Sequence, residues 1–347
     1  MNRHRAAAAA LVVVLAACSK GSTAPASRIR ATVVAGGLDF PTNMAFAPDG
    51  RLFFDEKDTG RIRIVDGGTV VTQPFATLPV QGGGESGLLG LALDPHFGEQ
   101  PWVYVYYTSS VDGRNHLVRI RADGNVGGEP QDLLTLLVAS GIHNGGDIVF
   151  GPDGKLYVAV GETGDSTLSQ DPGSLGGKIL RLDADGSIPS DNPFPGNPAY
   201  ALGIRNSFGL CFNPVTGALW ETENGPDRDD EVNVIEAGKN YGWPDHLGTG
   251  GAPQFVPPLL VFDPVIVVTG CAFFDRVLAD GDQAPQRGTQ LVFGDFHGDL
   301  HRALVDTSGA ISSEGVVRHF AAGITDLEVG PDGDLYVATS SSILRLG

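Results

Sequence analysis

Short apolar segments rich in Val, Leu, Phe and Tyr alternate along most of the chain with Gly, Pro, Asp and Asn. This pattern predicts β-strands separated by turns. No stretch shows the period of a long amphipathic helix. The sequence therefore predicts an all-β fold, which leaves a sandwich, a barrel or a propeller as the candidate architectures.

A repeated unit distinguishes among these architectures. A strand, a proline-containing turn and a second strand recur in MAFAPDGRLFFDE (44–56), LALDPHFGEQPWVYVYYT (91–108), IVFGPDGKLYVAVGE (148–162), LCFNPVTGALWETEN (210–224) and LEVGPDGDLYVATSS (327–341). The last two copies are about twice as far apart as the others, so we expect a degenerate copy between 265 and 306. Six copies at this spacing predict a six-bladed β-propeller over residues 31–347.

The turns of the repeat account for several of its acidic residues. Pro presets φ, Asp bonds to its own backbone and Gly accepts a positive φ, which together make a tight turn. We therefore expect Asp49, Asp153 and Asp332 to be turn residues and not part of a functional site.

The first residues have the features of an export signal. Arg3 and Arg5 precede an apolar stretch at 6–14 that is too short to span a bilayer, and Leu15-Ala16-Ala17-Cys18 resembles a bacterial lipobox. We expect 1–17 to be a lipoprotein signal peptide, Cys18 to carry lipid, and 18–30 to form the lipidated N-terminus and a flexible tether. The lipid would anchor an exported protein in the periplasm or at the outer membrane.

Charge and cysteine content narrow the choice of partners. The formal net charge is −18 and no basic stripe is present, which argues against nucleic acid as a partner.

Cys211 and Cys271 would remain after processing. An exported domain allows them to form a disulfide, but two buried free cysteines fit the spacing equally well.

Three loops differ from their counterparts in the repeat: GGGESGLLG (82–90), GIHNGGDI (141–148) and GIRNSFGL (203–210), the last followed by ENGPDRDDEVNVIEAGKNYGWP (223–244). All flank hairpins at similar blade positions, so we expect them to meet at one mouth of the central channel. His143 is a candidate general base, and Arg205-Asn206 suits a carboxylate or quinone oxygen. The carboxylates of 227–231 are candidate Ca²⁺ ligands.

These segments resemble the glucose/sorbosone dehydrogenase family, six-bladed propellers that include aldose sugar dehydrogenases dependent on pyrroloquinoline quinone (PQQ). The most specific matching segments are KILRLDADGSIPSDNPF (178–194) and EVNVIEAGKNYGWP (231–244), and further matches run in family order over almost the whole chain after the signal.

The resemblance implies roles for individual residues. His143 matches the base that takes the proton of the anomeric hydroxyl, and Arg205 matches the arginine that polarises the quinone oxygen. Asn206 and Glu85 are implied cofactor contacts. For calcium, the implied ligands are the carbonyls of Gly225 and Pro226, with Asp230 and Glu231 supporting a second, structural ion.

The chain also departs from the family pattern. Phe208 stands where the family usually has Gln, and His297 falls where a lysine meets a cofactor carboxylate, with His301 or Arg302 as substitutes. Gly323 and Thr325 fall where the family has two arginines.

We expect a PQQ- and Ca²⁺-dependent oxidoreductase that converts an aldose or related sugar to its lactone and passes electrons to an acceptor. The alternatives are a propeller that has lost PQQ and binds a glycan or protein, and a calcium-dependent lactonase.

Overall fold

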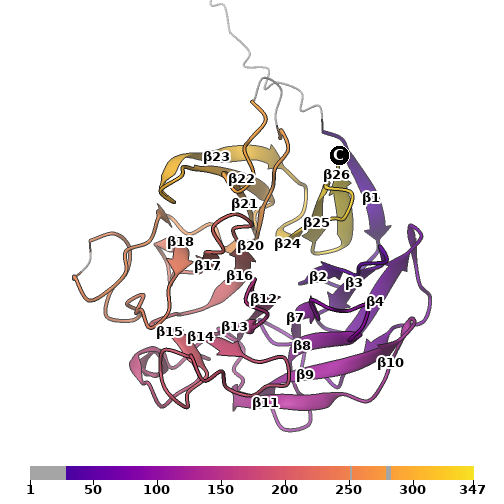
Figure 1. Cartoon of the computed structure of the whole chain (residues 1–347), viewed down its shortest axis with the longest axis horizontal. Helices are drawn as coiled ribbons and strands as arrows, with labels where there is room; N and C mark the ends of the chain where they lie inside the picture. The colour runs from indigo at the N-terminus through magenta and orange to yellow at the C-terminus, as the bar shows by residue number, and fades with distance from the viewer. Residues whose placement is uncertain (1–28, 251, 279–282) are drawn as a thin grey trace, which may run out of the picture.

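The computed structural model describes residues 29–250, 252–278 and 283–347, which fold into six antiparallel sheets arranged around a central channel (Figure 1). The predicted six-bladed β-propeller is confirmed. The predicted signal peptide, the lipidation site Cys18 and most of the tether lie outside the described residues and stay predictions. Within the described ranges, no helix has the length and apolar character needed to span a bilayer.

The first three blades follow one another along the chain. The first contains β2 (Met44–Phe46), β3 (Leu52–Glu56), β4 (Arg61–Asp66), β5 (Thr69–Val70) and β6 (Ala76–Thr77). The second contains β7 (Leu88–Leu93), β8 (Trp102–Thr108), β9 (Arg114–Asp123), β10 (Val126–Gly127) and β11 (Gln131–Val138). The third contains β12 (Gly145–Phe150), β13 (Leu156–Val160), β14 (Lys178–Leu182) and β15 (Ala199–Leu202), with the 3₁₀ helix η1 (Ser166–Gln170) before β14.

The remaining blades complete the ring. The fourth contains β16 (Ser207–Phe212), β17 (Leu219–Glu223), β18 (Asp230–Ile235) and β19 (Leu260–Phe262). The fifth contains β20 (Val268–Phe273), β21 (Gln290–Asp295), β22 (Asp299–Val305) and β23 (Ile311–His319). The sixth contains β24 (Ile324–Val329), β25 (Leu335–Thr339), β26 (Ser342–Leu346) and, from the start of the chain, β1 (Ala31–Gly36).

Strand β1 closes the ring. It pairs antiparallel with β26, from Ala31 opposite Leu346 to Gly36 opposite Ser342, so the two ends of the chain share one blade. This pairing covers the outer edge of β26, which would otherwise present unpaired backbone groups. The repeat did not reveal β1, because β1 lies outside the hairpin pattern.

The degenerate fifth copy is present where we expected it. Strands β20 and β21 form its hairpin, and a long connection replaces the proline turn. In the regular copies the turn aspartates behave as predicted: Asp153 Oδ1 accepts from Lys155 N at 3.1 Å, and Asp49 and Asp332 make the equivalent bond two residues on.

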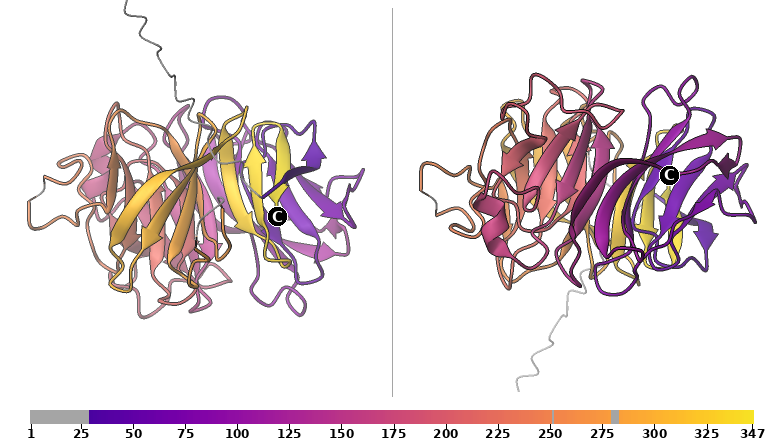
Figure 2. Two further views of the ribbon diagram at one scale, coloured as in Figure 1. Left: turned by 90° about the horizontal axis from the view of Figure 1, so that it is seen from above. Right: turned by 90° about the horizontal axis from the view of Figure 1, so that it is seen from below.

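Figure 2 shows the blades edge-on. The last residues of the innermost strands, among them Phe46, Phe150 and Phe212, line one cavity, so these strands run in the same direction along the channel. We call the end at which these strands begin the His143 face, and the end at which they finish, near the proline turns, the turn face. Apolar residues of neighbouring blades fill the space between sheets, as Phe53 and Leu91 do between the first and second blades.

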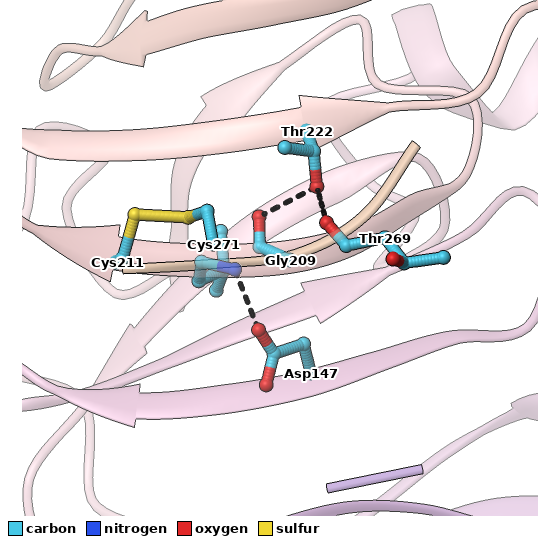
Figure 3. The surroundings of a disulfide bond; sticks show 7 residues. Asp147, Gly209, Cys211, Thr222, Thr269 and Cys271 are labelled. Carbon is cyan, nitrogen blue, oxygen red and sulfur yellow. Dashed lines mark hydrogen bonds between the residues drawn. A yellow bond between two sulfur atoms is a disulfide. The ribbon is translucent and has the colours of Figure 1, made fainter. Parts of the chain in front are cut away.

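A disulfide joins the inner strands of the fourth and fifth blades (Figure 3). Cys211 on β16 and Cys271 on β20 are bonded, with Cα atoms 5.8 Å apart. The strands approach closely beside it, because a Cβ at Gly209 would lie 2.6 Å from Thr269 O. The sequence left a disulfide and two free cysteines as alternatives, and the structure has the disulfide.

Candidate active site

His143 is held at the start of β12 by groups from the second, third and fourth blades. Its Nδ1 lies 2.6 Å from Glu162 Oε1, and its Nε2 lies 2.8 Å from Arg205 Nη2. A guanidinium only donates hydrogen bonds, so Nε2 is the acceptor and the ring proton is on Nδ1, where it is donated to Glu162. This tautomer presents an unprotonated Nε2, which a general base needs.

The backbone of His143 has a positive φ of 55°, which is uncommon for a residue other than glycine. Two hydrogen bonds fix it there. His143 N donates to Glu85 Oε2 at 2.5 Å, and His143 O accepts from Thr163 N at 2.9 Å. Gly161 is required beside it, since a Cβ at that position would lie 2.1 Å from His143 O.

Arg205 lies between His143 and the fourth blade. Its Nη1 donates to Asn224 O at 2.8 Å, its guanidinium lies 5.3 Å from the centre of the Trp243 ring, and its Nε has no partner among the described residues. Burial lowers the pKa of Arg205, and the surrounding carboxylates, Glu162 first among them, oppose that shift. The side chain is therefore a fixed positive charge with one free donor beside the imidazole.

Asn206 and Glu85 meet but are turned toward the protein. Asn206 Oδ1 accepts from Gly145 N at 3.1 Å and its Nδ2 donates to Glu85 Oε2 at 3.0 Å. The amide group of Asn206 is thus used at both ends. The pair clamps the His143 loop to the loop before β16, and the cofactor contacts implied for Asn206 and Glu85 stay predictions.

A cavity of about 310 Å³ opens beside this cluster on the His143 face. It is lined by Phe40, Thr42, Lys57, Gly84, Glu85, Leu89, Gly145, Asp147, Phe208, Val267, Thr269, Phe296 and Thr325. Three phenylalanines from the first, fourth and fifth blades form aromatic walls. A flat ligand suits such walls, because ring faces stack on planar groups.

The polar lining of this cavity includes two donors without a partner. The hydroxyls of Thr269 and Thr325 are buried and make no hydrogen bond to the described residues. Lys57 Nζ, in contrast, contacts Asp58 Oδ1 at 2.6 Å and the carbonyls of Gly84 and Ser86 at 3.2 and 3.3 Å. A ligand with acceptor oxygens would satisfy the two hydroxyls.

The residues predicted to replace the missing cations lie elsewhere. His297 is exposed and does not line the cavity, whereas its neighbour Phe296 does. His301 lies within the fifth blade, where it stacks on Phe293 and pairs with Asp295 and Glu314. Arg302 follows it on β22 and also does not line the cavity. Of the two residues that stand in place of the family's arginines, Thr325 lines the cavity and Gly323 does not.

The acidic loop of the fourth blade is only partly available to a metal. Asp230, predicted to support calcium, accepts from three backbone N–H groups, of Gly225 at 2.8 Å, Ile266 at 2.8 Å and Val267 at 2.6 Å. Its carboxylate therefore ties the loop to the fifth blade. Gly225 lines a small cavity next to Arg205, and Pro226 is exposed.

Glu231 belongs to a buried group of carboxyls that also contains Glu221 and Glu223. Glu223 and Glu231 are directly opposite on β17 and β18, and Asn233 Nδ2 donates to both Glu221 and Glu231, at 3.1 and 3.2 Å. Burial, followed by repulsion from Glu231, raises the pKa of Glu221 to about 8. Burial also raises the pKa of Glu223, with repulsion from Glu221 and Glu231, and that of Glu231, with repulsion from Asp229. A cation would relieve this repulsion. Across the described residues, no set of three or more His, Cys, Asp or Glu side chains has the arrangement of a metal site.

Sequence reasoning missed Glu162, Trp243 and Glu223. Glu162 lies two residues after β13, the partner strand of β12, so its place beside the His143 loop was the available signal. Trp243 and Glu223 are in the segment identified as unusual. Glu223 ends β17 and pairs with Ser207, so hairpin pairing brings it to Arg205, whereas the proximity of Trp243 depends on the path of a long loop.

The fold and this site together define a propeller of the sugar-dehydrogenase type. Residues 38–346 match the family model for glucose/sorbosone dehydrogenase, and the chain belongs to that family.

Characterised relatives cover most of the chain. It is 30% identical to an aldose sugar dehydrogenase of Escherichia coli, over 96% of this chain and 95% of that protein. It is 34% identical to quinoprotein glucose dehydrogenase B of Acinetobacter calcoaceticus, over 72% of this chain and 62% of that protein. The PQQ-bound structure of an aldose sugar dehydrogenase from Streptomyces coelicolor superposes with a TM-score of 0.82 at 33% identity, covering 93% of this chain and 99% of that one.

Proposed function

We propose that this protein oxidises an aldose or a related sugar at its anomeric C–OH group to the lactone, with PQQ as the oxidant. The observation that carries the proposal is the unprotonated Nε2 of His143, held by Arg205 and by Glu162. Glu85, which accepts from His143 N, and Gly145 line the neighbouring aromatic cavity, whereas His143 and Arg205 do not. Two relatives support PQQ as the cofactor. One is the PQQ-bound aldose sugar dehydrogenase from Streptomyces coelicolor, and the other is the quinoprotein glucose dehydrogenase B of Acinetobacter calcoaceticus.

The cavity fits a flat, oxygen-rich cofactor. Phe40, Phe208 and Phe296 offer ring faces, and Thr269 and Thr325 offer unused hydroxyl donors. Positive charge comes from Lys57 in the lining, which also pairs with Asp58, and from Arg205, which contacts His143 but does not line the cavity. Bound Ca²⁺ would add to this charge, which the carboxylates of the cofactor require.

The chain's own residues carry the proton chemistry. The sugar hydroxyl takes the place of Arg205 Nη2 at His143 Nε2, and Nε2 then takes the hydroxyl proton as the C–H bond of the same carbon breaks. Glu162 stabilises the imidazolium that forms, because its carboxylate already accepts from Nδ1. Arg205 would place its positive charge near the quinone oxygen of the cofactor, which gains electron density in the reaction. When bound, PQQ supplies the acceptor for the hydride.

For calcium, we propose the carbonyls of Gly225 and Pro226 for an ion at the cofactor, and Glu231 with Glu223 for a structural ion. The buried, mutually repelling carboxyls of the fourth blade support the second assignment.

Absorbance titration with PQQ in the presence and absence of Ca²⁺ tests the proposal. We expect a stoichiometric spectral change that requires Ca²⁺, and dye reduction when an aldose is added. If no spectral change occurs and no sugar of a broad panel reduces the dye, the proposal is wrong and the binding-module alternative takes its place.

We also propose that the mature protein is an exported lipoprotein anchored through Cys18. The Cys211–Cys271 disulfide supports an oxidising compartment. Metabolic labelling with a radioactive fatty acid should mark the wild type and leave Cys18→Ser unlabelled; equal labelling of both would contradict the assignment.

A further inference from the structure

A second cavity lies at the opposite end of the channel, on the turn face. Its volume is about 420 Å³, within the usual range for sites that bind small molecules. The ends of the inner strands line it, and its walls carry aromatic side chains from five blades: Phe46, Phe97, Phe150, Phe212 and Phe273.

This cavity is separate from the one beside His143. Among the described residues, Asp147 is the one that lines both. Its Oδ1 accepts from Asn43 Nδ2 at 2.8 Å, and its Oδ2 accepts from Leu210 N at 2.5 Å, the second contact being drawn in Figure 3. These bonds cross from the third blade to the first and the fourth, so they hold the Asp147 side chain in place between the two cavities.

The chemistry of the turn-face cavity is acidic and lacks a counter-ion. Its lining contains the carboxyls of Asp94, Asp147, Asp326 and Glu328, and none of its lining residues is Lys, Arg or His. Asp94, Asp147 and Asp326 accept hydrogen bonds, the last from Met44 N at 2.9 Å. Glu328 differs, because no hydrogen bond or ion pair reaches its carboxyl from the described residues.

The position of Glu328 makes its negative charge costly without a ligand. Burial in the channel, followed by repulsion from Asp147, raises the pKa of Glu328 to about 8. A bound cation would reverse both effects, since it would pair with the carboxylate and take the place of water.

We propose that the turn-face cavity binds a small organic cation, a primary ammonium carried on an apolar, preferably aromatic, body. The ammonium pairs with Glu328 and is attracted by the faces of the surrounding phenylalanines. The apolar body fills the aromatic part of the cavity. An anion would meet four carboxyls, and a bare metal ion would leave the aromatic walls unused. The site does not depend on the proposed dehydrogenase activity, because its lining shares only Asp147 with the cavity beside His143.

Calorimetric titration with 2-phenylethylammonium chloride at pH 8.5 tests this site, with neutral 2-phenylethanol as the matched ligand. We expect saturable one-to-one binding of the ammonium, at least about tenfold tighter than the alcohol, a ratio that one additional ion pair readily supplies. Glu328→Gln should remove that tenfold preference and leave alcohol binding unchanged. Glu129→Gln, at an exposed position of the second blade, should leave both affinities unchanged.

Two results would overturn the proposal. One is an ammonium affinity that is undetectable or equal in wild type and Glu328→Gln, with both proteins shown to be folded by circular dichroism. The other is competition between the ammonium and the sugar or PQQ, which would place the ligand on the His143 face.

Discussion

At the scale of single residues, the site depends on the tautomer of one histidine. Arg205 donates to Nε2 of His143 and Glu162 accepts from Nδ1, so two neighbours of opposite charge define which nitrogen is the base. The histidine and the arginine could be recognised in the sequence as unusual loop residues. Glu162 ends the recognised hairpin at 148–162 but was not singled out, because its contact with His143 also depends on the positive φ at His143.

Replacing Glu162 by Gln should therefore lower kcat by about 100-fold or more, with a smaller effect on KM. The amide keeps the shape of the side chain but removes the charge that stabilises the imidazolium. Steady-state kinetics of the PQQ-loaded protein measure this, with Glu99→Gln at an exposed position as the control. A Glu162→Gln enzyme with wild-type kcat would show that Glu162 does not position the base.

At the scale of strands, the sequence predicted the hairpins well, but it did not predict the strand pairing that closes the ring of blades. The proline turns located five of the blades, and the spacing located the sixth around β20 and β21. Strand β1 was missed, because its pairing with β26 joins opposite ends of the chain. The position of Phe296, in place of His297, in the cavity was also missed, since one residue in a tight turn decides which side chain points inward.

The disulfide between β16 and β20 should contribute substantially to stability. It closes a 60-residue separation, for which a chain-entropy model gives about 4 kcal/mol. The double variant Cys211→Ser and Cys271→Ser should unfold at a clearly lower denaturant concentration than the oxidised wild type. The reduced wild type should behave like the variant, and identical midpoints for oxidised and reduced protein would contradict the cross-link.

At the scale of the whole molecule, buried carboxyls of several blades resist ionisation. Burial raises the pKa of Asp55 and Asp147 to about 7, and that of Glu328 to about 8. In the unfolded chain these groups lose their protons near pH 4. Between the two values the folded state holds more protons, so the free energy of unfolding falls as pH rises from about 4.5 to 8.

Glu328→Gln should weaken this pH dependence. The variant should melt several degrees higher than the wild type at pH 8.5 and at nearly the same temperature at pH 4.5, where both side chains are neutral. Thermal melts at the two pH values, with Glu129→Gln as the control, measure the difference. A variant that is destabilised equally at both would show that Glu328 serves packing and not charge.

The most direct test of the account is a single-turnover reaction without oxygen, in which an aldose is mixed with protein loaded with PQQ and Ca²⁺. The account predicts that the wild type bleaches the oxidised cofactor band within one turnover, more slowly when the anomeric hydrogen is deuterium. His143→Asn should bind PQQ with the same spectral change and bleach it at least about 100-fold more slowly. Bleaching by His143→Asn at the wild-type rate would contradict the central role of His143 as the base.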